Sequence, residues 1–148
     1  MPQAIALILL DLDNFKPIND SLGHPAGDAV LIEVARRLGE ITRDTDLVAR
    51  LGGDEFIIVL SRPGQRVDMD RFCARVVESL QQPMLAEGHS VQVGVSLGVA
   101  LSAEYPGTPS DLIRYADIAL YSAKSAGKHT WRYFSAQMNE ALLEKRVL

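Results

Sequence analysis

The chain has 148 residues, of which 47% are hydrophobic and 23% charged, so we expect one domain with a full apolar core. The formal net charge of −4 argues against contact with nucleic acid or with an anionic membrane, because both need a basic face. The only cysteine, Cys73, excludes an internal disulfide and is expected to be a small buried residue in a helix. The apolar run 4–10 is too short to span a bilayer and lacks a basic leader, which predicts a cytoplasmic protein.

The first predicted element is a strand over residues 4–10. Its residues are all apolar, which favours a central strand covered on both faces. Its carboxyl end delivers Asp11 and Asp13 to the rim of the sheet, where open α/β sheets bind ligands. Residues 14–22 predict a short helix that ends at Gly23. The first amides of that helix would form an anion site beside the acids, although most helix starts bind nothing.

The longest helical pattern covers residues 25–42, with apolar residues along one face. Asp28 falls in its first turn, and a favourable interaction with the helix dipole is sufficient to explain it there.

A hairpin follows this helix. Residues 46–51 and 56–60 are rich in apolar strand-forming residues, and the Gly-Gly pair between them predicts a tight turn. Asp54 and Glu55 therefore stand side by side at the tip. Two interpretations are open: a solvated acidic turn, or a pair of carboxylates that hold a divalent cation.

The rest of the chain completes an α/β pattern. We expect a helix over 68–82, a hairpin over 84–101, a helix over 109–124, a strand over 131–134 and a last helix from residue 135 onward. In the second hairpin, Gly94 and Gly98 suggest close backbone contacts. The order β-α-α-β-β-α-β-β-α-β predicts a single domain with a central mixed sheet that contains antiparallel pairs and is flanked by helices.

The two groups of acids can meet if the first strand neighbours the hairpin. Asp11, Asp54 and Glu55 would then surround one point, beside the amides of residues 14–16. Carboxylates together with water and phosphate oxygens are the ligands that octahedral Mg²⁺ prefers, so the pattern predicts a magnesium nucleotide.

Four sequence blocks closely resemble the GGDEF domain of diguanylate cyclases. They are DLDNFKPIND at residues 11–20, GHPAGD at 23–28, GGDEF at 52–56 and YSAK at 121–124. The resemblance implies a palm-like nucleotidyl-cyclase fold over residues 1–134. It also implies that two GTP molecules are joined into cyclic di-GMP with release of pyrophosphate.

The same resemblance implies a role for each site residue. Mg²⁺, or Mn²⁺ in its place, would be held by Asp11, the carbonyl of Leu12, Asp54 and Glu55, the last two being the catalytic acids. Guanine would be bound by Asn19, Asp28 and Leu31, and phosphates by Asn14, Phe15, Lys16, Lys124 and Lys128. Asn and Asp acceptors suit the donors on guanine and would leave adenine unmatched.

The resemblance further implies an inhibitory site and a homodimer. Arg43 and Asp46 match an RxxD site for the product, whereas an ordinary surface ion pair is the alternative. Each domain would bind one GTP, so catalysis would need two facing domains.

Three departures from the family pattern stand out. The usual helix before the first strand is missing, Lys128 stands where Arg is common, and residues 135–148 resemble the start of a connector to a missing EAL domain. We therefore expect fused sensory and EAL phosphodiesterase domains in the full protein. The alternatives to an active cyclase are a GTP-binding domain that regulates an adjacent EAL domain without catalysis, and a receptor for cyclic di-GMP alone.

Overall fold

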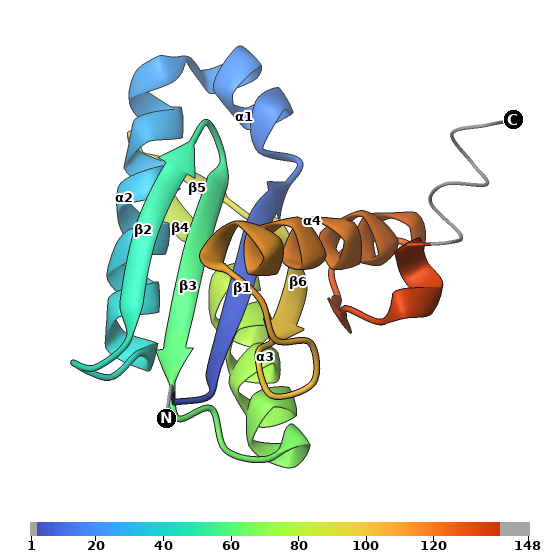
Figure 1. The fold of residues 1–148 in the computed structure, drawn as a ribbon. Coiled ribbons are helices and arrows are strands. Elements are labelled where there is room, and N and C mark those ends of the chain that lie inside the picture. The colour runs from blue at the N-terminus through green and yellow to red at the C-terminus, as the bar shows by residue number, and fades with distance from the viewer. Residues whose placement is uncertain (1–2, 140–148) are drawn as a thin grey trace, which may run out of the picture.

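A five-stranded mixed sheet forms the centre of the molecule, with helices on both faces (Figure 1). The structure is a computed structural model that describes residues 3–139. The strand order is β2-β3-β1-β6-β7, and β4 pairs with β5 in a separate small sheet. The elements are β1 (Ile5–Asp13), α1 (Phe15–Leu22), α2 (His24–Ile41), β2 (Leu47–Gly52), β3 (Glu55–Ser61), α3 (Arg66–Gln81), β4 (Met84–Ala86), β5 (His89–Val91), β6 (Gly94–Leu101), α4 (Pro109–Ser125) and β7 (Trp131–Tyr133).

Strand β1 is central and covered on both faces, as its unbroken apolar sequence predicts. Ile8 and Leu10 belong to the core beneath α2 and α3. Leu7 and Leu9 point to the other face and pack with residues of α4 such as Leu120. In Figure 1, α4 accordingly crosses one face of the sheet while α2 and α3 lie behind it.

Helix α4 lies very close to the sheet at Gly98 of β6. A Cβ atom at this glycine would lie 2.1 Å from the carbonyl oxygen of Ala116 and 2.3 Å from the amide nitrogen of Leu120. The predicted close backbone contact is confirmed here. The start of α4 is also as expected, because Thr108 and Asp111 form a reciprocal capping box.

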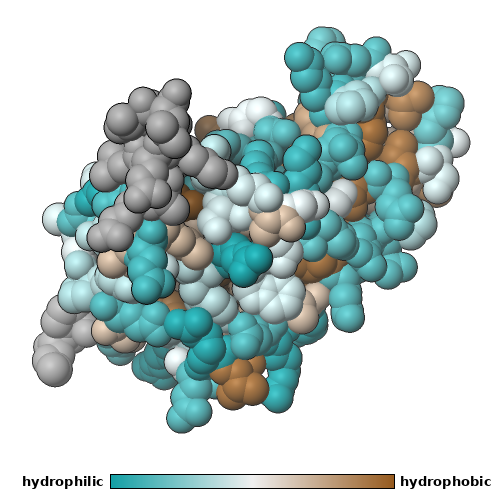
Figure 2. Space-filling model, turned by 90° about the vertical axis from the view of Figure 1, so that its right-hand side faces the viewer, coloured by the Kyte–Doolittle hydropathy of each residue, from teal (hydrophilic) through white to brown (hydrophobic). Residues whose placement is uncertain are grey.

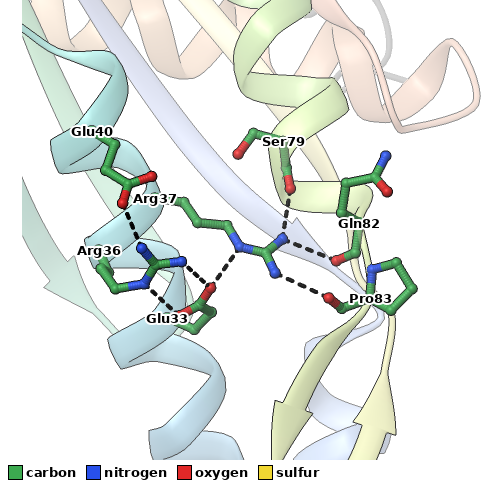
Figure 3. A network of polar contacts seen from close by, with 7 residues as sticks. All are labelled: Glu33, Arg36, Arg37, Glu40, Ser79, Gln82 and Pro83. Atoms are coloured by element: carbon green, nitrogen blue, oxygen red, sulfur yellow. Dashed lines mark hydrogen bonds and ion pairs between the residues drawn. The ribbon is translucent and has the colours of Figure 1, made fainter.

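Helices α2 and α3 are joined by Arg37 (Figure 3). Its guanidinium reaches from α2 to the end of α3, where it donates to the carbonyls of Ser79 (2.6 Å), Gln82 (2.9 Å) and Pro83 (3.0 Å). Glu33 accepts from its Nε at 2.7 Å. Arg37 thereby supplies a charged donor to carbonyls at and just beyond the end of α3, where the helix itself provides few partners.

Three local expectations are wrong. The hairpin predicted over residues 84–101 has no continuous return strand, because the chain leaves β4–β5 and enters the main sheet only at β6. Strand β1 extends through Asp13, so Asp11 and Asp13 belong to the strand instead of following it. Asp28 is the fifth residue of α2, beyond its first turn, so a first-turn interaction with the helix dipole does not explain it.

Figure 2 shows one face of the molecule, on which hydrophilic residues predominate and hydrophobic residues form small separate groups. None of the helices in residues 3–139 is long and apolar enough to cross a membrane. Cys73 is buried, as expected. The predicted last helix begins at residues 136–139, and its continuation lies outside the described residues.

Candidate active site

The end of β1 and the tip of the β2–β3 hairpin meet at one edge of the sheet. Strands β1 and β3 are antiparallel, and their register places Asp11 directly opposite Glu55. The amide of Leu12 donates to the carbonyl of Asp54 at 3.2 Å, which ties the tip to β1. Residues that are more than forty positions apart in the sequence therefore come together, as the two acidic patterns predict.

Asp11 is the most constrained of these acids. Its side chain is 8% exposed, and its Oδ2 contacts the ammonium group of Lys124 from α4. Its other oxygen, Oδ1, is buried and has no hydrogen-bond partner among the described residues. Burial raises the pKa of Asp11, Lys124 opposes this, and the nearby Asp54 adds to it. A buried carboxylate oxygen without a partner is well suited to bind a cation.

Glu55 also lies in an environment that disfavours its negative charge. Burial raises its pKa, and the charges of Asp11, Asp54 and Asp117 raise it further. Lys124 is the counterion: burial lowers its pKa, but its hydrogen bond to Asp11 and the surrounding acids outweigh burial and raise it. The edge of the sheet thus gathers more negative charge than one lysine neutralises.

The residues present fit a metal that is only partly coordinated by protein. Residues 3–139 contain no group of three or more His, Cys, Asp or Glu side chains placed to hold a metal ion by themselves. Mg²⁺ commonly takes one or two carboxylates and fills its remaining positions with water and substrate phosphates. Asp11 and Asp54, with the carbonyl of Leu12, form a donor set of that kind.

A candidate phosphate site lies beside these acids, at the start of α1. Asn14 has a left-handed backbone (φ 64°) at the N-cap, and its side chain makes no capping hydrogen bond. The first amides of a helix have no acceptor inside the helix, so those of Phe15 and Lys16 are suited to bind an anion. Lys124 comes from the last turn of α4, and Lys128 follows in the loop.

A hollow of about 490 Å³ lies between α2 and β2, close to the hairpin. Asp28 and Leu31 line it from α2, Val48 and Arg50 line it from β2, and Phe56 is also part of its lining. Two of the predicted guanine-binding residues therefore share one hollow.

Asn19, the third predicted guanine-binding residue, lies on α1 against Gly27 of α2. It is therefore held next to the residue that precedes Asp28.

Arg50 is a site residue that the sequence interpretation missed. Its Nε donates to the carbonyl of Gly53 at 3.1 Å, so it supports the backbone of the hairpin tip while it lines the hollow. A basic residue two positions before the Gly-Gly pair was the available signal.

Asp13 does not lie on the open rim of the sheet, contrary to expectation. It is buried, and it accepts hydrogen bonds from the hydroxyl of Ser96 at 3.0 Å and from the amide of His129 at 3.0 Å. It joins β1, β6 and the loop after α4, and its role is structural.

The Arg43–Asp46 pair lies at the other end of the hairpin, beside β2. Asp46 has a side chain only 2% exposed and accepts from the amides of Arg43 (2.8 Å) and Ser61 (3.1 Å). Burial alone would raise the pKa of Asp46, but these hydrogen bonds, with that of the Arg43 guanidinium, lower it. Asp46 therefore fixes the corner and holds the guanidinium of Arg43, which also donates to the carbonyl of Ser61.

A second hollow, of about 360 Å³, adjoins this corner. Its lining includes Arg43 and Asp46 together with two arginines that the sequence interpretation did not name, Arg62 and Arg75. Asp68 also lines this hollow, and the guanidinium of Arg43 donates to Asp46, so Arg62 and Arg75 are the arginines that would meet a ligand with anionic groups.

The chain matches the family model described as "Diguanylate cyclase, GGDEF domain" over residues 1–130. It is 40% identical over 139 residues to the diguanylate cyclase TpbB of Pseudomonas aeruginosa, a match that covers 93% of this chain and 32% of TpbB. It is 39% identical over 146 residues to the bifunctional diguanylate cyclase/cyclic di-GMP phosphodiesterase MucR of the same species, covering 97% of this chain and 21% of MucR. The chain thus spans less than a third of the length of these relatives.

Solved structures share the fold. The GGDEF domain of TpbB superposes with a TM-score of 0.90 at 38% identity, covering 95% of this chain and 83% of the solved one. The GGDEF domain of DgcB from Caulobacter crescentus, solved in complex with c-di-GMP, gives a TM-score of 0.79 at 27% identity and covers 91% and 79%. Since the family model matches most of its length, the chain belongs to the GGDEF domain family of diguanylate cyclases.

Proposed function

We propose that this domain condenses two GTP molecules into cyclic di-GMP and releases pyrophosphate. The observation that carries the proposal is the meeting of Asp11, Asp54 and Glu55 at the sheet edge, with one buried oxygen of Asp11 unpartnered among the described residues. This arrangement lies beside a hollow of about 490 Å³ that contains Asp28 and Leu31. A cation site next to a base-sized hollow suits a metal-bound purine nucleotide.

The acids would hold the metal on which the family typically depends. Asp11, Asp54 and the carbonyl of Leu12 are the proposed ligands, and Glu55 completes the acidic cluster beside them. Bound Mg²⁺, or Mn²⁺, supplies charge that offsets the triphosphate and lowers the pKa of the attacking 3′-hydroxyl. Asp54 is the proposed acceptor of the hydroxyl proton.

The remaining residues would bind and orient the nucleotide. The amides of Asn14 to Lys16 and the ammonium groups of Lys124 and Lys128 contact the phosphates in this proposal. Asn19 and Asp28 accept hydrogen bonds from the N1 and N2 donors of guanine, and Leu31 packs against the base. The acceptor pair favours GTP over ATP, because adenine would leave both acceptors unmatched.

The reaction joins two nucleotides, and each domain offers one hollow of this kind. We therefore propose that two domains face each other, so that the 3′-hydroxyl of one GTP reaches the α-phosphorus of the other. Two reciprocal in-line attacks, one by each 3′-hydroxyl, then form both phosphodiester bonds and expel two pyrophosphates. Two copies of the domain joined by a linker should be more active per domain than dilute single domains.

The test is product formation from GTP and Mg²⁺ by a dimerised form of the chain, followed by chromatography of cyclic di-GMP and measurement of released pyrophosphate. Asp54→Asn, which keeps the size of the side chain, should reduce the rate at least 10²-fold, in the range found for loss of a general base. An Asp54→Asn variant as active as the unchanged chain would refute the assignment. GTP binding without product in the unchanged chain would instead support the non-catalytic regulatory alternative.

We also propose that the hollow beside Arg43 and Asp46 binds the product. The three arginines that line it support this, and the related DgcB domain was solved in complex with c-di-GMP. Arg43→Ala should weaken cyclic di-GMP binding in calorimetry while GTP binding at the distant edge stays unchanged. Equal product affinity in both proteins would exclude this role for Arg43.

A further inference from the structure

Helix α2 contains two glycines, Gly27 and Gly39, with very different surroundings. Glycine inside a helix is unfavourable compared with alanine, so each position calls for a reason. Neither has a positive φ that would require glycine. At Gly39 a Cβ atom would meet nothing within 4 Å, whereas Gly27 is buried and its surroundings are full.

The space at Gly27 is filled by the side-chain amide of Asn19. A Cβ atom at Gly27 would lie 2.3 Å from Asn19 Oδ1, 3.1 Å from Asn19 Cγ and 3.3 Å from Cζ of Phe15. These three nearest atoms all belong to side chains of the preceding helix segment. The glycine therefore makes room for a side chain, and the nearest atom is the acceptor oxygen of the amide.

Asn19 is not among the residues that line the hollow, and its contact with Gly27 is what connects it to that site. Asn19 lies on α1, and its backbone carbonyl accepts from the amide of Gly23 at 3.0 Å, which fixes the turn between the two helices. Asp28, the next residue after Gly27, lines the hollow. Seating Asn19 against Gly27 places its oxygen next to the segment that presents the carboxylate of Asp28.

We propose that Gly27 is a positioning residue for base specificity. Because it has no side chain, the Asn19 amide can lie where it accepts a hydrogen bond from guanine together with Asp28. This inference rests on the proposed function of Asn19. The substitution Gly27→Ala displaces a flexible amide and no backbone atom among the nearest neighbours, so the fold survives while the acceptor moves.

The experiment measures the affinities of GDP and ADP by calorimetry, since neither can be condensed. The proteins are the unchanged chain, Gly27→Ala, Asn19→Ala, the double variant and Gly39→Ala as the matched control in the same helix. Gly27→Ala should bind GDP about three- to tenfold more weakly, the loss expected for one hydrogen bond, and ADP as before. The GDP to ADP preference should fall by the same factor, and Gly39→Ala should leave it unchanged.

The double variant separates a positioning role from a general packing role. Once Asn19 is truncated, its space is free, so adding Gly27→Ala to Asn19→Ala should cause no further loss of GDP affinity. If Gly27→Ala does not fold but the double variant does, the clash with Asn19 is equally demonstrated.

Other outcomes overturn the inference. They are an unchanged GDP to ADP preference in Gly27→Ala, a further loss of GDP affinity in the double variant equal to that in Gly27→Ala alone, or unfolding of both Gly27→Ala and the double variant. If Asn19→Ala itself binds GDP normally, guanine reading by Asn19 fails as well, which distinguishes failure of the proposed function from failure of this inference alone.

Discussion

Replacing Lys124 with Met should destabilise the domain in a way that a divalent cation repairs. Lys124 is the only cation in hydrogen-bond contact with Asp11 among the described residues, and the Asp11 side chain is 8% exposed. Methionine has an unbranched apolar side chain of similar length to that of lysine, but it lacks the ammonium group. The variant leaves a nearly buried carboxylate without its counterion.

The magnitude follows from burial. Breaking a fully buried ion pair costs about 3–5 kcal/mol, but the Lys124 side chain is 39% exposed, so water screens the pair and we expect about 1–2 kcal/mol. For a domain of this size that is a fall of about 2–8 °C in Tm. Mg²⁺ or Mn²⁺ can then occupy the place beside Asp11, and at ten times its Kd a ligand returns about 1.4 kcal/mol.

The pH dependence gives an independent check. Losing Lys124 raises the pKa of Asp11 beyond the increase that burial and Asp54 already cause. A carboxyl group whose pKa is raised on folding costs stability as pH rises above its unfolded pKa, and the cost is complete above the folded pKa. The loss of folding stability caused by Lys124→Met should therefore be larger at pH 7.5 than at pH 4.

Thermal unfolding by circular dichroism, with and without Mn²⁺ and without nucleotide, measures both effects. Lys128→Met is the control, because it removes a nearby lysine for which residues 3–139 show no ion pair. The reasoning is refuted if Lys124→Met has the same Tm as the unchanged chain, or if Mn²⁺ stabilises Lys124→Met and the unchanged chain equally.

Three further substitutions test the electrostatics and the packing, each by denaturant or thermal unfolding. Arg37→Ala should cost about 2–3 kcal/mol of stability, because three carbonyls at the end of α3 lose a charged donor. The control Arg36→Ala removes a side chain that is 55% exposed and should cost less than about 1 kcal/mol. Equal losses would show that Arg37 does not hold the end of α3. Gly98→Ala should cost about 1–3 kcal/mol because α4 must move away from β6, and unchanged stability would contradict the close contact. Glu55→Gln should raise stability at neutral pH and not in acid, because burial and the charges of Asp11 and Asp54 raise the pKa of Glu55. The same substitution should abolish cyclase activity. A loss of stability at neutral pH would argue against repulsion between the acids at this edge.

The parts of the fold that the sequence predicts are those encoded by local patterns. An unbroken apolar run identified β1 as central, and a Gly-Gly pair between apolar runs identified the β2–β3 hairpin. Thr108 and its neighbours marked the start of α4. The separation of β5 from β6 was missed, because both segments favour strands and only tertiary contacts decide which sheet each one joins.

The candidate site likewise has parts that the sequence predicts and parts that it does not. The meeting of Asp11 with the hairpin acids was predicted on the condition that the first strand neighbours the hairpin, which the structure meets. The burial of Asp13 was not predicted, because its partners Ser96 and His129 lie more than eighty positions further along the chain. The contact of Lys124 with Asp11 and the space at Gly27 depend on helix placement, which no local pattern reports.

The two hollows both adjoin β2 but have no lining residue in common, and this separation has a pharmacological consequence. A compound confined to the hollow beside Arg43 therefore does not occupy the hollow proposed for the base. Such an inhibitor would lower the maximal rate and leave the KM for GTP unchanged, so abundant cellular GTP could not outcompete it. Resistance to it would arise at Arg43, Arg62 or Arg75, outside the catalytic acids.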